Sequence, residues 1–373
     1  MKNTESYQPR SEKLPTDLDQ VTPAWLNRTL QLRYPDLEVR DFEIVELNNT
    51  HTTKLRLVLE LNQAAVDAGF PRNVCLKANW SGSPLSSGSG ICELEARFYR
   101  YFREQLAVPA PLSYYADWDE DGFNQGLVVM EDLACSDVTF CTAIDPIDAA
   151  EMARSLEGMA ELHSSCWDNG VLDQHPWLKI SMGANSSDAN MYRSLEEHML
   201  YNNSLASRRA VLPGWFLEDP ERLSRAYDLL VAHERAQPGP RTLIHGDAHL
   251  GNSYVTSDGD RRWLDWQIVR QGTPWRDLNY FMTSSMTVAE RRSNEQHLLR
   301  HYLELMTARG CEMPAFEDAW EQYCLWPIHG LASFNGSRDE WQLPGSILAG
   351  VERFSAAIED HESVQRMGRI SRR

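Results

Sequence analysis

Two short segments in the second half of the chain each carry oxygen-bearing side chains after an apolar run. Residues 243–252 read LIHGDAHLGN, and residues 262–268 read RWLDWQI. Asp247 and Asn252 lie in the first segment, and Asp265 lies in the second. Carboxylate and amide oxygens are the ligands that Mg²⁺ prefers, and phosphate oxygens and water complete the shell of such an ion. Asn252 and Asp265 therefore predict a magnesium site, which leaves Asp247 to accept a proton from a hydroxyl group.

The spacing of these residues matches a pattern found in kinases. An asparagine follows the first aspartate by five residues, and a second aspartate follows it by 18. The chain resembles the aminoglycoside phosphotransferase and choline-kinase-like superfamily, and within it the ecdysteroid kinase-like group. The resemblance is carried by HGDAHLGN and LDWQ, by GTPWRDL at 272–278, by VVMEDL at 128–133, by EARFY at 95–99 and, more weakly, by RFSAAIEDH at 353–361.

The resemblance implies a protein-kinase-like α+β fold of two lobes, with a mixed β-sheet in the N-terminal lobe and mainly helices in the C-terminal lobe. It implies that Asp247 orients an acceptor hydroxyl and takes its proton. It also implies that Asn252 and Asp265 hold Mg²⁺ on the phosphates of ATP. Such a site positions the acceptor hydroxyl next to ATP. It also places positive charge where negative charge builds up on the transferred phosphoryl group.

The same resemblance assigns the nucleotide contacts to the N-terminal part of the chain. Lys77, in the run VCLKA, would contact the α- and β-phosphates and pair with Glu95 on the following helix. Backbone groups near Glu131 and Leu133 would contact the edge of the adenine ring. Glu93 competes with Glu95 for the position that faces the lysine.

The loop expected over the phosphates departs from the usual pattern. Residues 47–54 read LNNTHTTK and contain no glycine, although glycines normally let backbone N–H groups approach a phosphate closely. The hydroxyl groups of Thr50, Thr52 and Thr53 could compensate. This departure bears on the affinity for ATP more than on the type of reaction.

Each site residue also has a plain structural interpretation. Asp247 and Asp265 could be ordinary turn aspartates at strand ends, and Asn252 could cap a helix or a turn. Lys77 could extend along the surface to solvent, and Glu95 could be solvated. The full pattern favours the chemical interpretation over these alternatives.

The two histidines of the first segment are expected to be structural. His245 is expected to be buried and hydrogen-bonded beneath the loop, and His249 is expected to be structural, with contact to a substrate as the alternative. Their four-residue spacing is known from zinc-binding helices, but Gly246 argues against a helix there, so a metallohydrolase is not expected. Asp277 is expected to hold the loop in place by hydrogen bonding. The tryptophans are expected in the core, and an aromatic pocket for a bulky acceptor remains open.

Hydrophobic periodicity indicates the elements that position these residues. Strands are expected at residues 39–47, 54–61, 73–79, near 112–116 and at 126–130. The segment 91–106 has helical spacing through Leu94, Phe98, Tyr101 and Phe102 or Gln105. These elements predict a nucleotide-binding lobe over residues 1–133, with a hinge near 130–134.

Helical patterns dominate residues 134–373, apart from one strand-like stretch at 241–269. Asp145 followed by proline predicts the start of one helix. Its apolar face would comprise Met152, Leu156, Met159 and His163. Thr287 and Glu290 form a capping-box pattern for a helix that runs to about residue 308 and stops at a glycine. This C-terminal lobe would carry the catalytic and metal-binding loops and the acceptor site.

The composition of the chain indicates its cellular compartment and excludes some classes of binding partner. With 36 Lys and Arg against 54 Asp and Glu, the net charge of −18 disfavours a general role in binding nucleic acid. The seven cysteines are scattered and include no CxxC pair, which favours a reducing compartment. We find no signal peptide pattern and no apolar run long enough to cross a bilayer. The sequence therefore predicts a cytoplasmic protein with no membrane association and no evident obligate protein partner.

These observations predict an ATP-dependent kinase that phosphorylates a hydroxyl group of a small molecule. A protein acceptor is disfavoured because HGD and DWQ stand where protein kinases have HRD and DFG, and no APE-like segment follows. A polycyclic alcohol such as an ecdysteroid, an aminoglycoside, a choline-like amino alcohol and a hydroxyacyl-CoA all remain possible acceptors. The glycine-free loop motivates an alternative, a catalytically silent nucleotide-binding module of the same fold. A third alternative is an interaction protein that uses no nucleotide.

Overall fold

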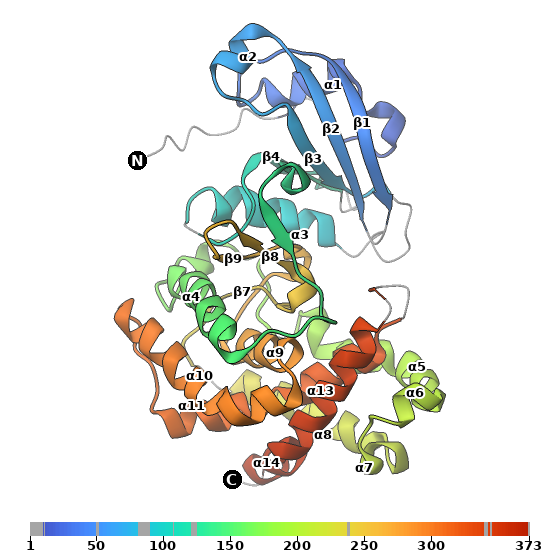
Figure 1. Cartoon of the computed structure of the whole chain (residues 1–373), viewed down its shortest axis with the longest axis vertical. Coiled ribbons are helices and arrows are strands. Elements are labelled where there is room, and N and C mark those ends of the chain that lie inside the picture. The colour runs from blue at the N-terminus through green and yellow to red at the C-terminus, as the bar shows by residue number, and fades with distance from the viewer. Residues whose placement is uncertain are drawn as a thin grey trace. The chain divides into compact units, whose positions relative to one another are not determined.

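The computed structural model describes residues 10, 12–49, 52–80, 90–106, 108–120, 125–236, 239–338, 342–343 and 345–371. It divides into two compact units (Figure 1). The first unit comprises Met1–Val138 together with Leu264–Ile268, and the second comprises Thr139–Trp263 and Val269–Arg373. The first unit is built on an antiparallel sheet and the second is mainly helical, which confirms the predicted α+β fold class.

The first unit contains a five-stranded sheet in the order β1-β2-β3-β5-β4, with every neighbouring pair antiparallel. Its strands are β1 (Val39–Asn49), β2 (Thr53–Leu61), β3 (Asn73–Ala78), β4 (Ser113–Trp118) and β5 (Gly126–Glu131). Its helices are α1 (Pro23–Leu30), α2 (Gln63–Asp67) and α3 (Ile91–Phe98). The five strands expected from the sequence are all confirmed.

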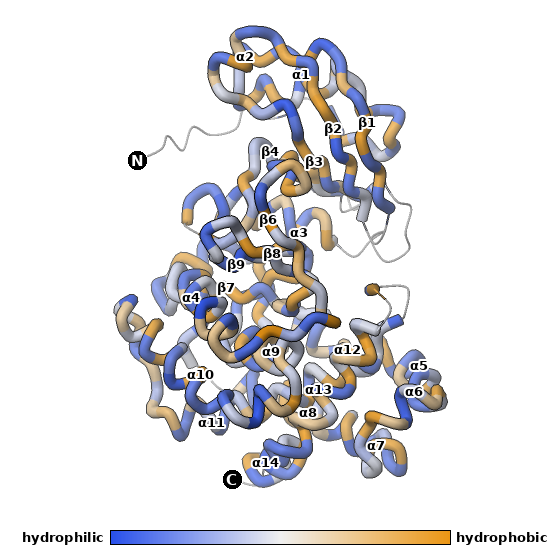
Figure 2. The backbone as a smooth tube through the Cα atoms, viewed as in Figure 1, coloured by the Kyte–Doolittle hydropathy of each residue, from blue (hydrophilic) through white to orange (hydrophobic). Residues whose placement is uncertain are grey.

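Alternation of apolar and polar residues accounts for the sheet. Leu55, Leu57 and Leu59 of β2 are fully buried, whereas the residues between them are exposed or half-buried. The tube of β2 accordingly changes between apolar and polar colours along its length (Figure 2). Trp25 and Leu26 of α1 belong to the same buried core. At β2 the sheet thus has one face toward the core and one toward solvent, whereas β5 is buried on both faces.

The predicted helix at 91–106 is α-helical only from Ile91 to Phe98. It continues as a π-helical turn over Tyr99–Arg103, with the Glu104 N–H 3.3 Å from the Tyr99 carbonyl oxygen. Tyr99 and Phe102 of this turn are both buried. On the predicted apolar face, Phe98 and Phe102 are fully buried, whereas Leu94 and Tyr101 are half-buried.

The second unit combines two small sheets with many helices. β6 (Val138–Phe140), β8 (Ser253–Thr256) and β9 (Arg261–Trp263) form one sheet, and β7 (Thr242–Ile244) pairs antiparallel with β10 (Arg270–Gly272). The helices are α4 (Ala149–Ser165), α5 (Met191–Ser204), α6 (Ala206–Arg209), α7 (Gly214–Glu218), α8 (Glu221–Ala236), α9 (Trp275–Ser285), α10 (Val288–Ala308), α11 (Phe316–Tyr323), α12 (Pro327–Gly336), α13 (Ser346–Asp360) and α14 (Ser363–Ile370).

The predicted start of α4 at Asp145 was wrong. The helix begins at Ala149, and Asp148 caps it by accepting a hydrogen bond from the Glu151 N–H at 2.8 Å. The Ile147 N–H instead bonds the Ser285 carbonyl 2.9 Å away, which holds this part of the chain outside the helix. The predicted apolar face of α4 is confirmed, since Met152, Leu156, Met159 and His163 are all fully buried.

The predicted helix after Thr287 is confirmed. The Thr287 hydroxyl accepts a hydrogen bond from the Glu290 N–H at 3.1 Å, and α10 runs to Ala308. No helix among the described residues is both long and apolar enough to span a bilayer. All seven cysteines are free thiols.

Glycines allow α12 and α13 to pack side by side (Figure 2). A Cβ atom on Gly330 would lie 2.0 Å from the Phe354 ring, and one on Gly350 would lie 2.1 Å from the Phe334 ring. Each helix thus receives the buried phenylalanine of the other at a position that has no side chain. The Phe334 ring also packs against Tyr280 of α9, with ring centroids 5.5 Å apart.

Replacement of Gly350 by alanine is therefore expected to destabilise the protein. Because Phe334 is buried and cannot move freely, Gly350→Ala should lower the free energy of unfolding by about 1–3 kcal/mol. Gly368→Ala is the matched control, since no atom lies within 4 Å of its added Cβ in α14. Urea denaturation of the two variants compares them directly. An equal effect of both substitutions would contradict this account of the α12–α13 packing.

Candidate active site

Lys77 of β3 is the centre of a buried cluster of charges in the first unit. Its Nζ lies 2.7 Å from a carboxylate oxygen of Glu95 on α3 and 2.9 Å from Oδ1 of Asp265. Lys77 and Glu95 are 5% and 2% exposed, whereas Asp265 is 31% exposed. Burial alone would lower the pKa of Lys77, but the Asp265 and Glu95 carboxylates outweigh it and hold the pKa above its usual value. The lysine is therefore a cation shared by two carboxylates.

The competition between Glu93 and Glu95 is resolved by the structure. Glu95 faces Lys77, whereas Glu93 pairs with Arg97 on the same helix at 2.8 Å. The plain interpretations of Lys77 as a surface lysine and of Glu95 as a solvated residue were thus wrong. A nucleotide-binding role for Lys77 and Glu95 stays a prediction.

Asp265 belongs to a short segment that packs within the first unit. The Trp266 N–H donates a hydrogen bond to Glu95, and the Trp266 ring stacks on Phe98 with centroids 3.9 Å apart. The Asp265 backbone has φ of 63°, a left-handed conformation that costs energy for a residue with a side chain. These contacts maintain that conformation and leave the Asp265 carboxylate partly exposed.

The predicted phosphate-loop residues lie in different settings. Thr52 is buried, and its hydroxyl accepts a hydrogen bond from the Gln267 amide at 3.1 Å. Thr53 is also buried, and its hydroxyl donates to the Asn49 side chain. Thr50 lies outside the described residues. The contact of Thr52 with phosphate stays a prediction, and its hydroxyl already helps to hold the segment that carries Asp265.

Glu131 and Leu133 lie at the end of β5 and in the turn after it. The Glu131 N–H donates to the Leu112 carbonyl at 3.0 Å, and the Leu133 carbonyl accepts from the Ser136 N–H at 3.1 Å. Because these two groups have protein partners, an adenine ring would have to use other backbone groups of residues 131–133. The adenine contact stays a prediction.

In the second unit, the segment that carries Asp247 follows β7, and Asp277 holds its backbone by hydrogen bonds. The Asp277 carboxylate accepts hydrogen bonds from the backbone N–H groups of His245 at 2.6 Å and Gly246 at 2.9 Å. Gly246 has φ of 87°, which glycine adopts without steric cost. Burial would raise the pKa of Asp277, but the hydrogen bond and charge of His163 and the loop contacts hold it below its usual value. The predicted role of Asp277 is confirmed.

The Asp247 carboxylate is about one-third exposed and is oriented by its neighbours. The Asn252 amide donates to the Asp247 backbone carbonyl and to Oδ2, both at 3.0 Å. His245 is fully buried and accepts a hydrogen bond from the Asp247 N–H, as expected for a residue that supports the loop. His249 Nε2 lies 3.7 Å from Asp247 Oδ2, and its Nδ1 accepts from the Gly251 N–H. Asp247 thus keeps an accessible oxygen at a fixed position.

The sequence analysis missed Tyr280 of α9. Burial, together with the charge of Asp247 beside it, raises the pKa of Tyr280 well above its usual value, so the phenol stays protonated. Tyr280 also hydrogen-bonds Ser333 at 3.0 Å. Tyr280 follows Asp277 by three residues, about one helical turn, and this spacing could have indicated that both residues lie on the same face of the helix.

A buried ion pair that the sequence analysis also missed lies beneath the same loop. Arg276 pairs with Asp188 and donates a hydrogen bond to the Gly246 carbonyl at 3.0 Å. Burial would raise the pKa of Asp188, but Arg276 holds it well below its usual range. Asp188 lies 88 residues before its partner, so no local pattern could indicate the pair.

The predicted magnesium ligands offer oxygen atoms of suitable types. The Asn252 Nδ2 faces Asp247, so its amide oxygen points away from that carboxylate. The Lys77 cluster combines one positive charge with two negative charges, and the remaining negative charge and exposed Asp265 carboxylate suit a divalent cation. Within the described residues, no three His, Cys, Asp or Glu side chains are grouped to bind one metal ion. The role of Asn252 and Asp265 stays a prediction.

A model of the ecdysteroid kinase-like family matches residues 93–310, which is more than half of the chain. The chain belongs to the ecdysteroid kinase-like family. The matched residues include Glu95, Asp247, Asn252 and Asp265, whereas Lys77 precedes them. The resemblance inferred from the motifs is therefore confirmed.

The chain is also similar to a kinase-like protein in sequence and to two solved structures in fold. An uncharacterized kinase-like protein of Caenorhabditis elegans is 23% identical over 243 residues, which cover 61% of this chain and 60% of that protein. A candidate aminoglycoside phosphotransferase from Ralstonia eutropha is 14% identical with a TM-score of 0.55, covering 92% of this chain and 97% of that chain. The ethanolamine kinase of Plasmodium vivax is 13% identical with a TM-score of 0.52, covering 93% and 86%. At such identities, the two structures show the fold that this family member shares.

A pH-dependent effect on stability is expected from Asp277. Its pKa in the folded protein lies below the unfolded value of about 3.9, so its contribution is present above that pH and is lost as the pH falls through the folded value. Asp277→Asn should lower the free energy of unfolding at pH 7 by about 1–3 kcal/mol. The difference from wild type should shrink below pH 4 in urea denaturation. A difference that does not change with pH, or an equal effect of the exposed-site control Asp258→Asn, would refute the role of Asp277.

Proposed function

We propose that the protein transfers the γ-phosphoryl group of Mg·ATP to a hydroxyl group of a small molecule. The observation that carries the proposal is the Asp247 carboxylate, which Asn252 orients while one-third of the carboxylate stays exposed. The shared Lys77 cluster of charges and the membership in a kinase-like family support it. In this proposal, residues 1–133 bind the nucleotide, and residues 134–373 carry the base and the acceptor site.

On the acceptor side, Asp247 would act as the base. It would accept the proton of the acceptor hydroxyl as the O–H bond breaks. The acceptor oxygen would then form a bond to the γ-phosphorus while the bond to the bridging oxygen breaks, which yields a phosphate ester and ADP. Tyr280 stays protonated beside Asp247 and is therefore suited to donate a hydrogen bond to the carboxylate or to the acceptor.

On the nucleotide side, Lys77 would contact the phosphates, and Glu95 would position its ammonium group. Asp265 and Asn252 would hold Mg²⁺, which when bound neutralises charge on the phosphates. The Asp265 carboxylate would have to bind both the ion and Lys77. Its partial exposure supports a second contact of this kind.

A small-molecule acceptor is supported by the substrates of similar proteins. One is the ethanolamine kinase described above, and another is a spectinomycin phosphotransferase solved with ADP and spectinomycin, 12% identical with a TM-score of 0.51 and covering 88% of this chain and 94% of that chain. The sequence HGD, where protein kinases have HRD, also favours a small-molecule acceptor over a protein acceptor. We place the reaction in the cytoplasm, which the seven free thiols support.

A catalytically silent nucleotide-binding module is the second candidate function. The glycine-free phosphate loop favours it, because Thr52 and Thr53 in that loop are buried and already hydrogen-bonded. This alternative accounts less well for the exposed and oriented Asp247 carboxylate, which nucleotide binding alone does not require. The two candidates differ in whether phosphoryl transfer depends on Asp247.

Asp247→Asn separates binding from transfer. It should lower the transfer of label from [γ-³²P]ATP to a mixed pool of hydroxyl compounds by about 10²–10⁴-fold, the usual contribution of a positioned base. Calorimetric titration with Mg·ADP should show nearly unchanged affinity. Asp258→Asn is the matched control and should transfer label as wild type does. Transfer that persists in Asp247→Asn with only a mild loss would show that another group is the base.

Asp265→Asn tests the metal site without disturbing the backbone, since asparagine tolerates the left-handed conformation at this position. Wild type should bind ADP more tightly in Mg²⁺ than in EDTA, because the ion links the phosphates to the protein. Asp265→Asn should bind ADP equally in both conditions, and the exposed-site control Asp260→Asn should retain the difference. A magnesium effect that is unchanged in Asp265→Asn would remove Asp265 from the metal site.

A further inference from the structure

The second unit contains a cavity of about 410 Å³ that none of the residues discussed above for phosphoryl transfer lines. Its walls come from the segment after α4, from α8 and the link to β7, from the link between β10 and α9, and from α11 with the segment before it. Pro240 lies just before β7 and Thr273 just after β10. The cavity is thus at the end of the β7–β10 ladder opposite to the loop of Asp247. The three residues of β7 span about 10 Å.

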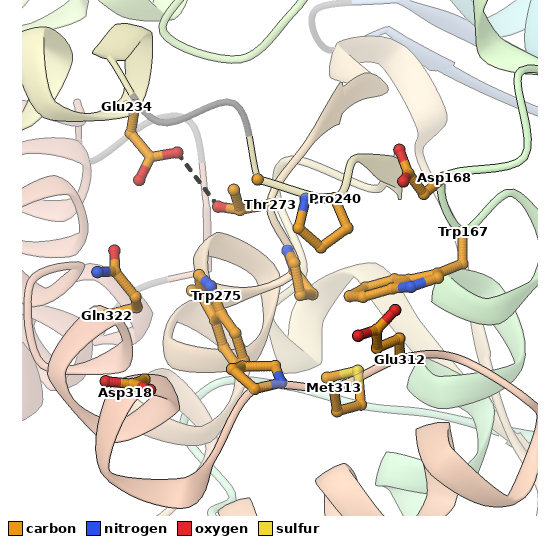
Figure 3. Close-up of a pocket in the computed structure, with 13 residues that line it drawn as sticks. Trp167, Asp168, Glu234, Pro240, Thr273, Trp275, Glu312, Met313, Asp318 and Gln322 are labelled. Carbon is orange, nitrogen blue, oxygen red and sulfur yellow. Dashed lines mark hydrogen bonds between the residues drawn. The ribbon is translucent and has the colours of Figure 1, made fainter.

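The lining combines aromatic surface with negative charge. Figure 3 shows the rings of Trp167 and Trp275 beside the cavity, together with the carboxylates of Asp168, Glu234, Glu312 and Asp318. None of the described residues that line the cavity is a lysine, an arginine or a histidine. A cavity of this volume lies within the range of small-molecule sites.

In the described part of the chain, none of the four carboxylates forms an ion pair with a lysine, arginine or histidine, although the charge of Arg276 acts on Glu234. Asp168, Glu312 and Asp318 are exposed, and Glu234 is half-buried. By contrast, the buried Asp188 nearby is paired with Arg276. The carboxylates give the cavity a negative potential, which favours the binding of a cation. Burial raises the pKa of Glu234 to about 7, and the Thr273 hydroxyl donates a hydrogen bond to its carboxylate at 3.2 Å (Figure 3).

We propose that this cavity binds a small organic cation, such as a compound with a protonated or quaternary amine. The positive group would lie among the carboxylates and against the faces of Trp167 and Trp275, which attract cations through the ring electrons. The apolar part of the ligand would contact Met313 and the prolines of the wall. Indole, thioether and proline surfaces suit an organic ligand and are not the ligands of a hard metal ion.

This site is separate from the proposed kinase chemistry and does not depend on it. The cavity adjoins elements that lead to the catalytic loop, because Trp275 is two residues before Asp277 and β7 runs directly into the segment of His245. The residues that line the cavity would determine which ligand binds there. Binding of that ligand can therefore be measured without ATP or an acceptor.

Phenyltrimethylammonium is a suitable probe, because it has no hydroxyl group and cannot accept a phosphoryl group. Calorimetric titration of the full chain should show saturable binding of one equivalent and no binding of benzenesulfonate, an anion of similar size. Glu312→Gln combined with Asp318→Asn should weaken binding by about tenfold, since two nearby charges are lost. Trp167→Leu should weaken it by about fivefold. Circular dichroism should show that both variants remain folded.

Two control variants locate the probe. Glu317→Gln removes a charge next to Asp318 that does not line the cavity, and it should leave the affinity unchanged. Asp247→Asn should also bind the probe as wild type does, which keeps this result independent of the proposed kinase site. The proposal is overturned if phenyltrimethylammonium shows no saturable binding or if benzenesulfonate binds equally well. It is also overturned if the Glu312→Gln and Asp318→Asn combination keeps wild-type affinity or if Asp247→Asn loses binding. Displacement of the probe by millimolar Mg²⁺ would overturn it as well.

Discussion

The buried ammonium group of Lys77 is the interaction on which the first unit depends. It draws together β3, α3 and the segment of Asp265, which are distant in sequence. Removal of one carboxylate would leave the ammonium group with a single carboxylate partner, and removal of both would leave a buried charge unpaired, a change that costs several kcal/mol in proteins. The cluster retains one net negative charge, and only Asp265 reaches solvent substantially. The same arrangement that stabilises the unit therefore leaves one carboxylate partly exposed, as the proposed magnesium site requires.

A second constraint acts in the other unit, where a loop must present one carboxylate to solvent. Asp277 and Arg276, neighbours on α9, bind the backbone of the loop through its N–H groups and its Gly246 carbonyl. Asp188 in turn neutralises Arg276. Buried charges thus hold the backbone of the loop, and Asn252 helps to orient the Asp247 carboxylate. Both units use paired buried charges to position one partly exposed aspartate each.

Local sequence patterns predicted the features that depend on neighbouring residues. The alternation in β2, the cap of α10 and the motif spacing needed only a few adjacent positions. The start of α4 was wrong because Asp145 and Asp148 are equally good caps, and a bond to the distant Ser285 decides between them. The Asp188–Arg276 pair could not be predicted for the same reason. The packing of residues 264–268 within the first unit likewise depends on contacts between segments far apart in sequence.

The central claim is that this chain transfers a phosphoryl group from ATP to a small-molecule hydroxyl. The most direct test incubates purified protein, Mg·ATP and a complex metabolite extract, and uses mass spectrometry to detect compounds that gain one phosphoryl group. The account predicts at least one such compound with wild type and none with Asp247→Asn. If broad extracts yield no such compound although Mg·ATP binding is shown separately, the result contradicts the account and supports a silent nucleotide-binding module.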